Sequence, residues 1–135
     1  MALLAGCGSA RPHSVGYLSF KGLLPGAVSG SPSDVAIEAS GAVMAVTVYG
    51  SGSCPGVPVA VHVFGPHLIT VRMSADYRGG CTDDLGPTTT LVNLATAVTV
   101  DDALRVQYSG LGRGEVRPRQ LTSMPTTATP LGTGS

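Results

Sequence analysis

The sequence predicts an all-β domain: a small antiparallel β-sandwich, or a partly open barrel, of about six to seven strands with one disulfide. Two observations lead to this prediction. Valine-rich segments alternate apolar and polar residues with a period of two, which is typical of half-buried strands. The segments are short, and Gly, Pro, Ser and Asp separate them at regular intervals. A domain this small cannot rely on its core alone, so a covalent staple is expected.

Length and charge narrow the possible functions. With 135 residues, the chain has room for one small domain and little more. Eight basic residues balance eight acidic ones, so the composition indicates neither a nucleic-acid partner nor an anionic surface. No apolar run approaches the length that spans a bilayer.

The first hairpin is expected over residues 35–49. Ser40-Gly41 makes a two-residue turn between two alternating segments. This turn places Ile37 opposite Met44 and Val35 opposite Val46. One apolar face results, which also carries Ala39, Ala42 and Val48, while Glu38, Val43, Ala45 and Thr47 face the other way.

The second hairpin is expected over 57–64 and 69–74. A two-residue turn at Gly65-Pro66 would place the two apolar sets on opposite faces, whereas a three-residue turn that includes His67 places them on one face. We therefore expect the longer turn. It pairs Val63 with Ile69, Val61 with Val71 and Val59 with Met73, and it leaves Ala60, His62, Thr70 and Arg72 on the outer face.

Two further elements follow. Residues 88–94 are β-branched and come after Gly86-Pro87, which predicts a strand. Residues 97–108 are expected to form the last hairpin, with a three-residue turn at 101–103. This turn would pair Val100 with Leu104 and Val98 with Val106.

The chain divides into four parts by composition. Residues 1–7 are interpreted as a truncated signal peptide, 8–33 as a flexible tether, 34–109 as the β domain and 110–135 as a disordered tail. Within the tether, the moderately apolar residues 15–24 either dock on the domain as an edge segment or remain part of the tether.

The N-terminal residues Leu3-Leu4-Ala5-Gly6-Cys7 resemble the lipobox of bacterial lipoproteins. In that family the cysteine carries a diacylglyceryl group and becomes the new N-terminus, so the resemblance implies lipidation of Cys7 and anchoring in a membrane. The alternative is a chance match in an Ala- and Gly-rich chain. Six upstream residues are too few for a signal peptide. We therefore expect that the start codon lies further upstream or that the sequence was trimmed.

The remaining cysteines, Cys54 and Cys81, are expected to form the disulfide, because the N-terminus indicates export; two free buried thiols are the alternative. The segments GSGSCPGVP (50–58) and CTDDLGPTTT (81–90) resemble small secreted or lipid-anchored actinobacterial proteins with GSSSCP.VP and CTADLAPTTS stretches. The resemblance covers about the middle third of the chain. It implies an exported β domain with a Cys54–Cys81 bond, and it transfers no activity.

No catalytic residue is predicted. The GSGSC stretch (50–54) matches neither a nucleophile elbow nor a dinucleotide fingerprint. His62, His67 and Asp83 or Asp84 have no tight metal-ligand spacing, and Asp76 with these two aspartates matches no EF-hand. We expect instead that Asp84 shapes a turn by accepting hydrogen bonds from nearby backbone amides. No metal and no cofactor are expected.

Together these patterns favour a non-enzymatic binding or interaction module, secreted or anchored on the outer face of the cell membrane. Its partner is either a small ligand or another envelope protein. An accessory subunit of an envelope complex is the second hypothesis, in which a free sheet edge pairs with a partner strand. A small hydrolase ranks third, because no nucleophile, base and orienting group converge in the pattern.

Overall fold

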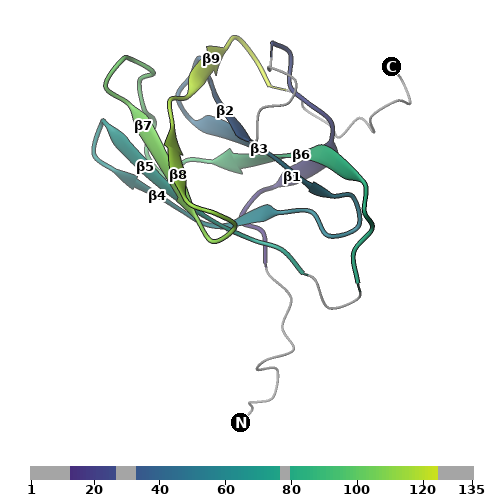
Figure 1. Ribbon diagram of the computed structural model, residues 1–135. Coiled ribbons are helices and arrows are strands. Elements are labelled where there is room, and N and C mark those ends of the chain that lie inside the picture. Colours follow the sequence, from purple (N-terminus) through teal and green to yellow (C-terminus); the bar gives the residue numbers. More distant parts are fainter. Residues whose placement is uncertain (1–12, 27–32, 77–79, 125–135) are drawn as a thin grey trace.

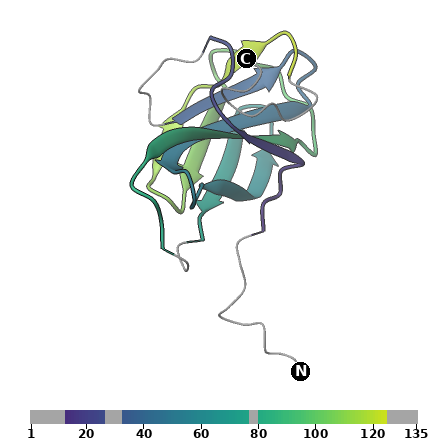
Figure 2. The same cartoon turned by 90° about the vertical axis from the view of Figure 1, so that its right-hand side faces the viewer.

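A computed structural model describes residues 13–26, 33–76 and 80–124, and these residues form nine β-strands and no helix. They are β1 (Leu18–Lys21), β2 (Ser33–Glu38), β3 (Val43–Ser51), β4 (Val57–Phe64), β5 (Leu68–Ser74), β6 (Leu85–Asn93), β7 (Arg105–Ser109), β8 (Gly114–Val116) and β9 (Arg119–Leu121). One sheet has the order β1-β6-β3-β2-β9 and the other β4-β5-β7-β8. The two sheets lie face to face (Figures 1 and 2). This arrangement confirms the predicted small β-sandwich. The described residues form more than the expected six to seven strands, because β1 lies in the predicted tether and β8 and β9 lie in the predicted tail.

Both central hairpins have the predicted turns. Ile37 lies opposite Met44 in the β2–β3 pair, and Val63 lies opposite Ile69 in the β4–β5 pair. One detail of the second hairpin was predicted wrongly. A bulge between Pro58 and Ala60 displaces Val59, so that Pro58 takes the position opposite Met73. A proline has no N–H for a regular ladder, and bulges are where strands accommodate it.

The main core fills the space between the sheets. Its walls are the inward faces of β2 and β3 on one side and of β5 and β7 on the other. β5 and β7 run parallel, which sets Ile69 beside Val106. The fully buried members are apolar: Ile37, Met44, Ile69, Leu104 and Val106.

The five-stranded sheet is also covered on its other face. Ala36 and Ala45 are completely buried there, beneath Leu24 and Met124 from segments outside the strands. From the alternation of apolar and polar residues in the sequence, we could predict only that the side chains on this face point away from the main core. Its small alanines allow the covering segments to approach closely. Of the two alternatives left open for residues 15–24, edge docking is the one observed, because β1 pairs with β6.

The predicted last hairpin is wrong. Residues 97–100 are not a strand, and β7 pairs with β5 and β8 instead. The amide of Val98 donates to the carbonyl of Gly41 (N···O 3.0 Å), so this segment crosses the end of the sandwich. Val98 and Leu104 are buried there. The segment between β6 and β7, which contains these residues, therefore closes this end of the sandwich. We call it the plug; it packs against the core without extending a sheet.

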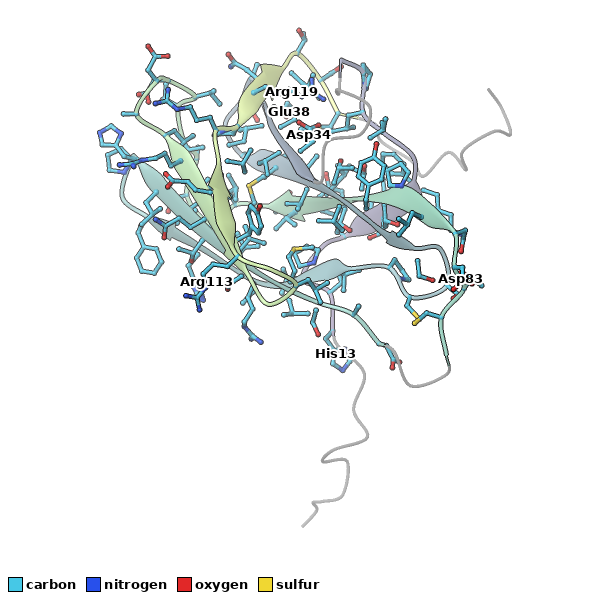
Figure 3. All side chains as sticks on the ribbon, viewed as in Figure 1. His13, Asp34, Glu38, Asp83, Arg113 and Arg119 are labelled. Atoms are coloured by element: carbon cyan, nitrogen blue, oxygen red, sulfur yellow. A yellow bond between two sulfur atoms is a disulfide. The ribbon has the colours of Figure 1, made fainter. Side chains whose placement is uncertain are left out.

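The expectation of a disordered tail fails for residues 110–124. β8 pairs with β7, and β9 runs parallel to β2. Arg119 of β9 donates from Nε and Nη2 to the carboxylate of Asp34 at 3.0 and 2.9 Å. Figure 3 shows these two side chains together at the top of the molecule. The ion pair and the strand pairing hold a stretch whose Gly- and Arg-rich sequence has no regular apolar pattern.

Candidate ligand cavity at the open end of the sandwich

A cavity of about 370 Å³ lies between the two sheets, at the end opposite the plug. β3 contributes Val46, Val48 and the strand's last residues, and β5 contributes Val71 and Met73 from its second half. The turn between β7 and β8 closes the side of the cavity. Gly112 and Arg113 of that turn line the cavity and are exposed to solvent.

The wall of the cavity is apolar and its rim is polar. No acidic side chain is among the described residues that line it, and Arg113 is the charged residue of the set. Figure 3 shows Arg113 at the β7–β8 turn with its guanidinium directed away from the core. The lining residues are Val35, Val46, Val48, Tyr49, Gly50, Ser51, Cys54, Gly56, Val71, Met73, Val106, Tyr108, Leu111, Gly112 and Arg113.

The disulfide stands beside this cavity. Cys54 lines it and is buried, and its sulfur is bonded to that of the exposed Cys81. The Cα atoms are 5.6 Å apart, which is within the usual range for a bridge. The bond joins the end of β3 to the segment before β6, 27 residues further along the chain. It confirms the predicted staple and indicates an oxidising compartment.

A hydroxyl cluster supports the staple. The amide of Thr82 donates to Ser53 Oγ at 2.9 Å, and the Ser51 and Thr82 hydroxyls lie 3.0 Å apart. The Thr82 hydroxyl also donates to Asp84, and this hydrogen bond is the main reason why the pKa of Asp84 is lowered. The amide of Gly52 donates to the same carboxylate at 3.4 Å. Asp84 therefore shapes the loop, as the sequence predicted.

The other residues considered for a metal site do not come together. In the described part of the chain, no three His, Cys, Asp or Glu side chains form a group that could hold an ion. His62 lies beside Phe64, with ring centroids 6.0 Å apart, on the exposed face of β4. His67 lies in the adjacent turn, whereas Asp83 and Asp84 belong to the loop that carries Cys81.

The predicted lipidation site lies outside the described residues, because these begin at His13 and Cys7 precedes them. Within the described ranges, no helix has the length and hydropathy needed to cross a membrane.

Sequence reasoning missed the cavity. It depends on Tyr108, Leu111 and Arg113, which the sequence pattern had assigned to a strand end and to a disordered tail. A usable signal was present: Gly110 and Gly112 flank Leu111, and closely spaced glycines of this kind indicate a turn.

The fold and the cavity define a class: a small disulfide-stapled β-sandwich with an apolar site between its sheets. In comparisons with family models, curated proteins and solved structures, nothing matches the chain. The function proposed below therefore rests on the chemistry of the cavity.

Proposed function

We propose that the protein is a non-enzymatic binding module of the cell envelope, held at the membrane by a lipid on Cys7, and that it binds a small ligand between its sheets. The cavity at the open end is the observation that carries this proposal. Its volume of about 370 Å³ falls in the range of small-molecule sites, which is roughly 300–1,000 Å³. An apolar wall with a few polar groups at the rim is the usual composition of such sites.

The lining of the cavity favours binding over catalysis. A hydrolase needs a nucleophile, a base and a group that orients the base. Ser51 is the serine among the described lining residues, and its hydroxyl lies within hydrogen-bond distance of Ser53 and Thr82. No histidine or carboxylate is in the described lining that could activate it. The described lining therefore supports a binding role better than a hydrolytic one.

The compartment supports the proposal as well. The Cys54–Cys81 disulfide persists where the surroundings are oxidising, as they are outside the cytoplasmic membrane. A diacylglyceryl group on Cys7 would supply two acyl chains, and two chains are enough for stable anchoring. The cysteine count agrees, because Cys7 is the cysteine left over once the other two pair.

The accessory-subunit hypothesis has one specific observation in its favour. β4 is an edge of the four-stranded sheet, and the exposed Phe64 lies at its end. In the described part of the chain, the backbone bond from Val15 N–H to the Pro58 carbonyl covers only the beginning of this edge. An exposed edge of this kind can accept a partner strand. Cross-linking from residue 62 to a membrane protein would favour this second function.

Mass spectrometry of the intact protein tests whether it is exported and anchored. The gene with its upstream coding region is expressed in a Gram-positive host, and the protein is analysed without reductant. We expect a diacylglyceryl mass on Cys7 and the loss of two hydrogen atoms at Cys54 and Cys81, as oxidation of two thiols to a disulfide requires. Cys7→Ser is the matched control, which should keep the disulfide and lose the lipid. An unmodified Cys7 in the wild-type protein would overturn the anchored form of the proposal.

A further inference from the structure

We infer that the ligand is a single-chain amphiphile with an anionic head group, whose chain lies between the sheets and whose head lies at the rim near Arg113. This inference rests on the proposed function, because it takes the cavity as the binding site and names the chemistry of the occupant. Three features of the cavity lead to it: the wall, the charge at the rim and the size.

The wall of the cavity requires that the buried part of the ligand is apolar. Val46, Val71 and Met73 are nearly completely buried, and their side chains carry no strong hydrogen-bonding group. Among the described residues, no buried side-chain nitrogen or oxygen lacks a hydrogen-bond partner. A polar ligand group placed deep in the cavity would therefore lose its water without gaining a partner, which is costly. A hydrocarbon chain has no such cost and gains from burial.

The rim favours a negative head group. Arg113 has no ion-pair or hydrogen-bond partner among the described residues, whereas Arg105 and Arg119 are paired with Glu115 and Asp34. Since no acidic side chain is in the described lining, the charge of Arg113 is not balanced within the site. An exposed guanidinium at the rim can reach a carboxylate that remains in contact with water.

A second depression near Arg113 is a weaker candidate for the head group. It lies on the outer face of the four-stranded sheet and is lined by Thr70, Gln107, Ser109, Arg113 and Glu115, among others. The Glu115 carboxylate, which is paired with Arg105, lies beside Arg113 in this depression, whereas the cavity has no acidic side chain in its described lining. The depression also has no apolar wall of the kind that a chain needs. We therefore place the chain between the sheets and use the outer face as a control.

The volume limits the length of the chain. A volume of about 370 Å³ corresponds to about twelve water-sized groups at ~30 Å³ each. Decanoate, with about twelve non-hydrogen atoms, fits this volume, so it serves as the probe. From the binding efficiency usual for small ligands, its Kd is expected in the range of roughly tens of micromolar.

The experiment compares three probes with the same chain: decanoate, decanol and decyltrimethylammonium. Each is titrated into the folded protein, and methyl and amide NMR spectra report where it binds and how tightly. We expect decanoate to shift the methyl signals of Val46, Met73 and Val106. Decanol should bind at the same methyls about threefold more weakly, and the ammonium probe more weakly still, because a rim-exposed charge pair contributes modestly.

Two arginine variants test the role of the rim. Arg113→Gln should remove the difference between decanoate and decanol and leave decanol binding unchanged. Arg72→Gln is the matched control, because Arg72 is exposed on the outer face and does not line the cavity. It should leave the threefold preference in place. Val48→Phe fills the cavity and should abolish binding of all three probes; its amide spectrum shows whether the fold is kept.

The outcomes separate this inference from the function on which it rests. Equal binding of decanoate and decanol at the inner methyls would overturn the anionic head group and leave the binding cavity in place. Shifts confined to Thr70 and Gln107 would place the ligand on the outer face and also overturn it. If no probe shifts the inner methyls, the cavity itself fails as the site. Phosphatidylglycerol vesicles are added in a separate titration. If the protein binds these vesicles but does not bind monomeric decanoate, it contacts a membrane surface, and this result would likewise overturn the inference.

Discussion

The two ends of the sandwich are closed in different ways. At one end the segment between β6 and β7 crosses the gap between the sheets and buries Leu94, Val98 and Leu104. Backbone bonds attach it to the β2–β3 turn, from the Leu94 amide to the Ala42 carbonyl (2.8 Å) and from the Val98 amide to the Gly41 carbonyl (3.0 Å). At the other end the cavity lies between the sheets, and the Cys54–Cys81 bond joins the loops beside it.

The difference shows how one small domain can combine stability with a site. Apolar packing holds the plugged end, and removing packing there is costly. The open end has less of that packing, because the cavity leaves volume there unfilled, and a covalent bond stabilises this end instead. Regions with few buried contacts open most readily, so ligand entry is expected at the open end.

The largest contrast is expected from one substitution made at both ends. Leu104→Ala at the plugged end should lower the free energy of unfolding by about 2–5 kcal/mol, because this side chain is fully buried and leaves a closed void. Leu111→Ala at the open end should cost about 1 kcal/mol or less, because this half-buried side chain already borders a cavity. Urea unfolding measures both. Equal costs would show that the two ends are packed alike.

The disulfide should account for the next largest effect. The bridge spans 27 residues, and removing it should lower the free energy of unfolding by about 2–4 kcal/mol. The double variant Cys54→Ala/Cys81→Ala, compared by urea unfolding with the wild type with and without reductant, measures this cost. Amide hydrogen exchange should then increase around residues 50–56 and 80–85 and remain slow at Val98. Uniform acceleration would mean that the bond holds the whole domain and not the open end.

Two glycines with positive φ provide a finer comparison. Gly41 (φ 79°) lies under the plug, where an added Cβ would overlap the carbonyl oxygen of Val98. Gly112 (φ 86°) lies at the rim of the cavity, where an added Cβ would meet no atom within 4 Å. Gly112→Ala should cost about 1 kcal/mol from backbone strain alone. Gly41→Ala should cost about 2–4 kcal/mol, because the overlap adds to the strain. Thermal unfolding of both variants checks this order.

The sequence predicted those parts of the fold in which a local pattern decides the structure. In both central hairpins, moving the register by one residue would have placed the apolar side chains in water. Ile37 opposite Met44 and Val63 opposite Ile69 follow from that constraint. The disulfide was predictable from cysteine number and compartment for a similar reason, since few arrangements are possible.

The parts that were not predicted depend on contacts between distant segments. Residues 97–100 have the alternation of a strand, but they pack across the end of the sandwich, and both sides of β7, their expected partner, are already paired with β5 and β8. The parallel pairing of β5 with β7 and of β2 with β9 has no local signature. Nor could the pattern show the cavity, because a cavity is volume that side chains of several strands leave unfilled.

The smallest expected effect concerns the loop beside the disulfide. The hydrogen bond from the Thr82 hydroxyl is the main cause of the lowered pKa of Asp84, and the Gly52 amide and the charge of Lys21 lower it further. Thr82→Val should therefore raise the pKa of Asp84 toward its ordinary value, and carboxyl NMR titration measures the change. Lys21→Met is the control, since it should move the pKa less. A larger effect of Lys21→Met would show that charge, and not the hydroxyl, holds the loop.

The same lowered pKa gives a pH dependence with a definite sign. Between the folded and the unfolded pKa of Asp84, the unfolded chain binds more protons than the folded one, so the carboxylate favours folding above the unfolded value of about 3.9. This contribution should disappear as the pH falls through the folded pKa. Unfolding of the wild type and of Asp84→Asn should therefore differ slightly at neutral pH and converge in strong acid. Because Asp84 is exposed, the difference should also shrink in high salt, as expected for a surface contact that assists the covalent staple.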